Sequence, residues 1–138
     1  ASGWKIGEKD ATDDRIGRIS EELGKTDQGI FEVQTAIGRR TISCYQLPIE
    51  YARYDTTSFN VYHDVEDAKN GILQFGHSKN HRCDLLQFKQ GLGTLDPAGV
   101  PIMIETFAGN RADDICYVPA WRRMVQMIGR PDFLFIAD

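Results

Sequence analysis

A chain of 138 residues has the size of one modest domain and can bury a single core. Hydrophobic residues make up 41% and charged residues 26%, a balance that excludes an intrinsically disordered tail. The formal net charge of −4 excludes a surface that is electropositive as a whole, but not a site whose carboxylates bind metal ions beside phosphate. No apolar run approaches the roughly 20 residues of a membrane-spanning helix, and no signal peptide opens the chain, so the cytoplasm is the expected compartment.

The three cysteines, Cys44, Cys83 and Cys116, are odd in number and far apart in the chain. Such spacing matches neither a disulfide framework nor a four-ligand zinc module, so we expect reduced thiols with mostly structural roles. The chain starts without a methionine and stops directly after an apolar run, which suggests a piece of a longer protein.

The first third of the chain has a helical pattern. The spacing of its apolar residues predicts a first helix over 12–24 and a second from about residue 26 toward Cys44. Pro48 closes this region, because the residue before a proline leaves the helical basin. We expect residues 1–48 to form a small helical lead-in segment.

From Ile49 the pattern changes to strand, and residues 49–138 are expected to form the main domain. Alternation and β-branched or aromatic residues predict three strands, at 49–62, 84–92 and 100–107. In the second of these, the apolar residues share one face, opposite Gln87 and Lys89. The stretch 93–99 has the turn residues of a hairpin connection.

One more helix and one more strand complete the pattern. A helix is expected within 113–128, with Pro119 in its first turn, where a missing N–H costs nothing. Its predicted buried stripe consists of Ile115, Val118, Trp121, Val125 and Ile128. The apolar run 133–137 lacks alternation, which is typical of a strand buried on both faces. The predicted fold class is therefore α/β (α+β): an antiparallel trio, a crossover helix and a fourth strand in one mixed sheet, preceded by the helical segment.

Asp55 and Asp138 are the aspartates whose positions favour chemistry. Asp55 lies inside an otherwise uncharged strand, where a carboxylate must be hydrogen-bonded, paired or metal-bound. Asp138 follows the most apolar strand, and ligands gather beyond the carboxyl ends of strands in open sheets. Two such carboxylates can converge on Mg²⁺, which prefers oxygen ligands. The alternative is that each aspartate caps a neighbouring backbone group.

The densest polar run is 76–84, and it has three interpretations. Lys79, His81 and Arg82 are hydrogen-bond donors, which favours contact with phosphate. His77, His81 and Cys83 together suggest zinc, although the four-ligand pattern is not present. A solvated loop is the third interpretation.

The turn at 109–113 precedes the predicted last helix. Asn110 or Asp113 can cap that helix, and this structural role is the favoured one. A functional role for Asn110, Asp113 and Thr56 at the edge of the aspartate site is the alternative.

These motifs occur in a fixed order along the chain. They are YDTTSF at 54–59, GHSKNHRCD at 76–84, GVP at 99–101, GNRAD at 109–113 and the apolar strand that ends at Asp138. The ordered set resembles the DDE-type transposases of bacterial insertion sequences in the IS-four superfamily. ATDDRIGR at 11–18 is similar to the helix that precedes such domains, so the resemblance covers most of the chain.

The resemblance implies an RNase H-like fold and DNA transposition with two Mg²⁺ or Mn²⁺ ions. Asp55 matches the first catalytic aspartate of the family and Asp138 the second, and both would be metal ligands. Lys79 and Arg82, with His81 beside them, match the family's basic segment, for which we expect contact with DNA. The implied partners are transposon ends, target DNA and further copies of the full-length protein, in the bacterial cytoplasm at the nucleoid.

Three features depart from the family pattern. Asn80 replaces the usual acid, and Cys83 stands where proline is common. The third carboxylate, a glutamate, is expected beyond residue 138, so we expect a truncated catalytic domain that is inactive alone. A remnant that binds DNA or a partner transposase without cutting, and an unrelated RNase H-like nuclease, are the alternatives.

Overall fold

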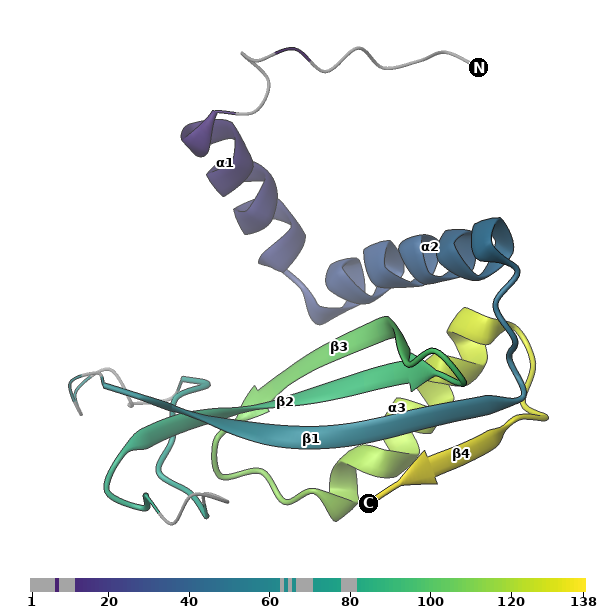
Figure 1. Ribbon diagram of the computed structural model, residues 1–138. Helices are drawn as coiled ribbons and strands as arrows, with labels where there is room; N and C mark the ends of the chain where they lie inside the picture. Colours follow the sequence, from purple (N-terminus) through teal and green to yellow (C-terminus); the bar gives the residue numbers. More distant parts are fainter. Residues whose placement is uncertain (1–6, 8–11, 63, 65, 67–70, 78–81) are drawn as a thin grey trace. The chain divides into compact units, whose positions relative to one another are not determined.

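The computed structural model describes residue 7 and residues 12–62, 64, 66, 71–77 and 82–138 (Figure 1). It divides into two compact units, Ala1–Val33 and Gln34–Asp138, each of which is described by itself. Among the residues that are described, no helix has both the length and the apolar character needed to cross a membrane.

The first unit contains α1 (Asp13–Gly24) and the start of α2 (Asp27–Tyr45). The backbone carbonyl of Thr12 accepts the N–H groups of Arg15 and Ile16, each at 3.0 Å, and so begins α1. The hydroxyl of Thr26 caps α2 by accepting the N–H of Gly29 at 3.0 Å. Both predicted helices are confirmed.

The second unit is built on a four-stranded mixed sheet with the strand order β3-β2-β1-β4. Its strands are β1 (Tyr51–Val61), β2 (Leu86–Leu95), β3 (Val100–Ala108) and β4 (Leu134–Ala137). β1, β2 and β3 are antiparallel, and β4 runs parallel to β1 after the crossover helix α3 (Asp114–Ile128). The predicted mixed α+β sheet is confirmed. β4 is an edge strand with Leu134 exposed, so the prediction of a strand buried on both faces is wrong.

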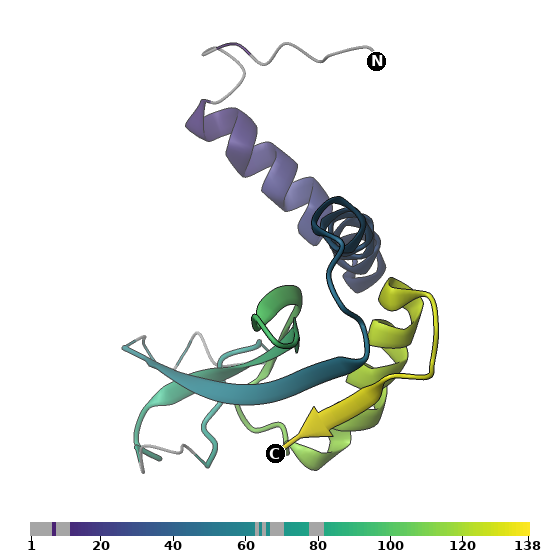
Figure 2. The same ribbon diagram turned by 45° about the vertical axis from the view of Figure 1, so that its right-hand side comes forward.

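α3 lies along one face of the sheet (Figures 1 and 2). Its buried residues are Cys116, Ala120, Met124 and Met127. The predicted stripe is wrong for Ile115 and Val118, which are more than half exposed, whereas Trp121, Val125 and Ile128 pack against the core. Small and flexible side chains let the helix approach the sheet closely. Pro119 lies inside α3 and not in its first turn.

The second half of α2 belongs to the unit of the sheet. Gly38 is buried there against the side chain of Met127, where there is no room for a larger residue. Gln34 pairs with the outer edge of β3: its Nε2 donates to the carbonyl of Ile104 at 2.9 Å, and its Oε1 accepts the N–H of Ile104 at 3.0 Å. These bonds satisfy backbone groups that an edge strand otherwise exposes.

The face of the sheet under α3 includes polar residues. In β1, Ala52, Tyr54 and Thr56 are buried, whereas the residues between them are exposed. In β2, Gln87 and Lys89 are buried on the face under α3, whereas Leu92 is 42% exposed. Lys89 Nζ and Gln87 Nε2 have partners in this layer, the latter donating to the carbonyl of Gly109 at 2.9 Å, whereas Gln87 Oε1 has no hydrogen-bond partner among the described residues.

Gly91 has no side chain, and the side chain of Tyr54 occupies the space where one would lie. The two residues lie on adjacent strands, and a Cβ at position 91 would overlap the hydroxyl of Tyr54. That hydroxyl donates to Glu105 Oε2 at 2.9 Å in the buried layer. A side chain at position 91 would therefore displace a buried hydrogen bond.

Gly91→Ala is expected to lower the free energy of unfolding by about 1–3 kcal/mol, because the tyrosine ring must shift in a packed core. Urea denaturation measures this difference. Gly17→Ala in α1 is the control, because a Cβ there meets no atom within 4 Å and stability should not fall. A Gly91→Ala protein as stable as the parent would contradict the close approach of Tyr54.

Candidate metal and nucleic-acid site

The two predicted aspartates follow paired residues on neighbouring parallel strands. The register of β1 and β4 pairs Tyr54 with Ala137, and Asp55 and Asp138 are the next residues along each strand. Adjacent strands lie about 4.8 Å apart, and side chains that continue this register would share one face of the sheet. Both aspartates are exposed.

Asp55 lies on the face of the sheet opposite α3, because side chains alternate along β1. Its Oδ1 accepts the backbone N–H of Thr56 at 2.8 Å. This bond orients the carboxylate along the strand. It is also the contact expected of an aspartate that caps a neighbouring backbone group, so the position of Asp55 fits both interpretations.

Tyr117 of α3 connects the helix with the end of β4. Its hydroxyl donates to the backbone carbonyl of Asp138, and Figures 1 and 2 show the end of the chain beside the start of α3. Desolvation raises the pKa of Tyr117, and the negative charges of Asp113, Asp138, Asp55 and Asp114 raise it further. The pKa of the Tyr117 phenol therefore depends in part on the charges of both candidate ligands. Sequence reasoning missed Tyr117, since no local pattern marks it.

Asp113 is held by two side chains from the sheet. Its Oδ1 accepts the hydroxyl of Thr56 at 2.7 Å and the ammonium of Lys89 at 2.6 Å. The Lys89 side chain is 8% exposed, and its Nζ also donates to the carbonyl of Arg111 at 2.7 Å. Asp113 occupies the N-cap position of α3 without a side-chain capping bond. The prediction that its side chain caps the helix is therefore wrong: the carboxylate binds Lys89 instead.

A second buried ion pair lies further along α3. Glu105 Oε1 is 2.8 Å from Arg123 Nη1, and its side chain is 4% exposed. Its other oxygen accepts the Tyr54 hydroxyl. Burial, together with the charge of Glu105, raises the pKa of Tyr54 far above its ordinary range. The contacts of Glu105 with Arg123 and Tyr54 thus connect the middle of the sheet with α3.

Two cavities are lined in part by residues of β1. One, of about 380 Å³, is lined by Thr56, Ser58, His77, Lys89 and residues 109–113, which places Asn110 at its rim. The other, of about 410 Å³, lies on the opposite face of the sheet and includes Asp55 and Thr57. Phe59, Leu92 and Ile104 give the second cavity an apolar floor.

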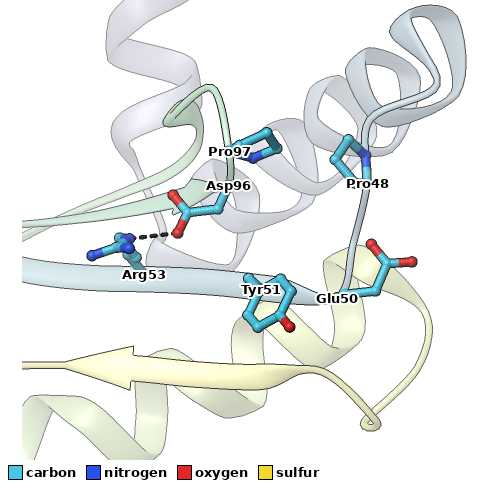
Figure 3. A pocket seen from close by; sticks show the side chains of 6 residues that line it. All are labelled: Pro48, Glu50, Tyr51, Arg53, Asp96 and Pro97. Atoms are coloured by element: carbon cyan, nitrogen blue, oxygen red, sulfur yellow. Dashed lines mark hydrogen bonds and ion pairs between the residues drawn. The ribbon is translucent and has the colours of Figure 1, made fainter.

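A third cavity, of about 480 Å³, lies at the start of β1 (Figure 3). Its charged pair is Arg53 and Asp96, whose Nε and Oδ2 are 2.5 Å apart. Pro48, Tyr51 and Pro97 contribute to its wall. Arg53 and Asp96 thus compensate each other's charge in the wall of this cavity.

The predicted basic segment is described only in part. Lys79 and His81 lie outside the described residues. Arg82 is exposed and donates two hydrogen bonds to Asp84, each at 2.8 Å. The same pairing lowers the pKa of Asp84. The zinc interpretation needs His81, and of its other members His77 and Cys83 are exposed.

The donor set at Asp55 and Asp138 suits a hard cation. Carboxylate oxygens are the ligands that Mg²⁺ prefers, and this ion commonly keeps several waters. Among the described residues, no group of three or more His, Cys, Asp or Glu side chains could hold a metal ion. Asp55 and Asp138 by themselves would supply two carboxylate ligands.

Lys89→Met is expected to lower the free energy of unfolding by about 2 kcal/mol, because it removes the cation that compensates a partly buried carboxylate. Chemical denaturation measures the change. Arg82→Met is the matched control: it also breaks an ion pair with aspartate, but an exposed one, and little change is expected. Equal effects of the two substitutions would contradict the structural role of Lys89.

Asp138→Asn is expected to lower the pKa of Tyr117, because it removes a negative charge that opposes ionisation of the phenol. Asp55→Asn should act in the same direction. NMR titration of ¹³C-labelled tyrosine measures both shifts. Asp132→Asn is the control, since that carboxylate pairs with Arg130. An unchanged Tyr117 in both variants would show that the two aspartates do not converge beside it.

The fold and the aspartate pair can be set beside known proteins. Comparisons of this chain with protein families, curated proteins and solved structures gave no match. The described residues form a mixed four-stranded sheet and three helices.

Proposed function

We propose that this chain carries the first part of an RNase H-like catalytic domain of a DDE-type transposase, which cleaves and joins DNA strands with divalent metal ions. The observation that supports the proposal is the register of β1 and β4, which pairs Tyr54 with Ala137, the residues that precede Asp55 and Asp138. The ordered motifs of the sequence supply the second support.

The order of elements agrees with what the resemblance implies. Three antiparallel strands, a crossover helix and a fourth strand parallel to the first bring the ends of two distant segments together. Asp55 comes from the middle of β1 and Asp138 from 83 residues further along the chain. An RNase H-like domain needs this arrangement to assemble carboxylates from separate strands.

In this proposal the surroundings of the aspartates act as positioning groups. The Thr56 N–H orients the carboxylate of Asp55, and the Thr56 hydroxyl binds Asp113 on the other face of the sheet. Tyr117 fixes the backbone at Asp138. Bound divalent ions would supply positive charge to the phosphate in an in-line transfer. The protein contributes orientation, which is most of what phosphoryl transfer requires of it.

The proposal is tested by DNA binding with and without Mg²⁺ at constant ionic strength, measured by fluorescence anisotropy on duplex DNA. Mg²⁺ normally weakens protein–DNA contacts, because it competes for the phosphates. Here it is expected to strengthen binding severalfold, because a cation between carboxylate and phosphate replaces repulsion by attraction. Asp55→Asn and Asp138→Asn should each abolish this gain.

Asp132→Asn has the same change in charge and serves as the matched control, which should retain the gain. DNA affinity that survives the loss of both Asp55 and Asp138, with no effect of Mg²⁺, would favour a binding remnant without a metal site. No affinity for DNA under any of these conditions would contradict both functions.

A further inference from the structure

The cavity of about 380 Å³ before the start of α3 has a wall with more positive than negative charge. Its charged lining residues are Lys89, Arg111 and Asp113, so two cations face one acid. The chain as a whole has a net charge of −4, which makes this balance a local property. A volume of this size is typical of sites for small ligands.

The ammonium of Lys89 has one more hydrogen to donate. The side chain is 8% exposed, and its Nζ donates to the carbonyl of Arg111 at 2.7 Å and to Asp113 Oδ1 at 2.6 Å. An ammonium has three N–H donors, so one of them has no acceptor among the described residues. Both acceptors belong to residues of the cavity wall, which places Nζ there. Because a buried donor without a partner is unfavourable, an acceptor inside the cavity would stabilise this ammonium.

Other polar groups of the same wall are also available to a ligand. The hydroxyl of Ser58, the imidazole of His77 and the amide of Asn110 make no hydrogen bond within the described part of the chain. The carboxylate of Asp113, in contrast, already accepts hydrogen bonds from two side chains. The cavity therefore offers mainly donors, and the complementary ligand is a negatively charged acceptor.

We propose that this cavity binds a small phosphomonoester through its terminal phosphate. Such a phosphate presents three acceptor oxygens and close to two negative charges at neutral pH, which match the ammonium, the guanidinium and the neutral donors of the wall. The N-cap residue of α3, Asp113, also lines the cavity, so the positive end of the helix macrodipole adds to the attraction. A phosphodiester within a duplex lies between two sugars and carries one charge, so it reaches the buried Lys89 less well.

This phosphate site is separate from the aspartate pair and does not depend on the proposed function. Asp55 lies on the other face of the sheet, and cationic side chains bind an anion without a metal ion. Phosphate binding is therefore expected to persist in EDTA and in Asp55→Asn, the conditions under which the Mg²⁺-dependent gain in DNA affinity is lost. The two proposals can thus fail separately.

Two-dimensional ¹H–¹⁵N NMR of the full chain tests the phosphate site, with titrations at constant ionic strength. Inorganic phosphate and deoxyadenosine monophosphate should each cause saturable shifts at Ser58 and residues 109–113. Deoxyadenosine, which lacks the phosphate, should cause none.

Competition by oligonucleotides identifies the source of the phosphate. A 5′-phosphorylated oligonucleotide that displaces the monophosphate, where its 5′-hydroxyl counterpart does not, would show that a strand end can supply the group. Failure of both to compete would restrict the site to small phosphomonoesters. Equal competition by the two would mean that backbone phosphodiesters bind, and would contradict the proposal.

Arg111→Gln is expected to weaken the binding of phosphate by on the order of tenfold, because it removes a charge-assisted hydrogen bond. Ser58→Ala should weaken it by roughly fivefold. Asp113→Asn should strengthen it severalfold, since it removes the negative charge of the wall but keeps an acceptor for Lys89. Arg122→Gln is the matched control and should have no effect, because Arg122 is exposed on α3 and does not line the cavity.

Thermal denaturation of each variant reports whether it folds, and Ser58→Ala and Arg111→Gln test the site even where Asp113→Asn lowers stability. The absence of saturable shifts with phosphate would overturn the proposal. So would equal effects of Arg111→Gln and Arg122→Gln, or deoxyadenosine that binds as tightly as its monophosphate.

Discussion

Two ion pairs between the sheet and α3, each with a buried charge on the sheet and a partly exposed partner, are the constraint on which the second unit depends. Lys89 binds Asp113 before the first turn of the helix, and Glu105 binds Arg123 near its last turns. The helical partners are ten residues apart, which is about 15 Å along a helix axis. A buried charge without its partner is strongly unfavourable, so α3 can neither slide nor rotate without breaking both pairs. These pairs define the position of the helix more than they raise stability.

That fixed position determines the geometry of the aspartate pair. Asp113 binds the hydroxyl of Thr56, the residue that follows Asp55, and Tyr117, one turn further along α3, binds the backbone of Asp138. α3 and its N-cap residue therefore contact both β1 and the end of β4, next to Asp55 and at Asp138. A shift of α3 would change the separation of the aspartates even though neither carboxylate is a partner in the ion pairs. Positioning of this kind decides how well two ligands can share one ion.

The order of elements could be predicted from the sequence because periodicity and turn residues are local signals. The buried face could not be predicted, since Lys89 and Glu105 have polar side chains whose partners lie far along the chain. A local pattern assigns such residues to solvent, and only the crossover helix, which brings Asp113 and Arg123 over the sheet, reverses that assignment. The sequence could indicate that Asp55 and Asp138 follow neighbouring parallel strands, and the pairing of Tyr54 with Ala137 agrees with that. Tyr117 could not be identified in this way, because its contact depends on the docking of α3.

In the proposed function, an acidic chain would have to approach DNA, and the distribution of its charge bears on how it could do so. Asp113 is compensated by Lys89 beneath it, so its negative charge is largely balanced locally. Asp55 and Asp138 lie on the exposed side, where their charges add and repel phosphate. A divalent cation held between them would cancel that repulsion at the one place where phosphate must come close. The net charge of −4 is then compatible with DNA as a partner, provided that metal binding comes first.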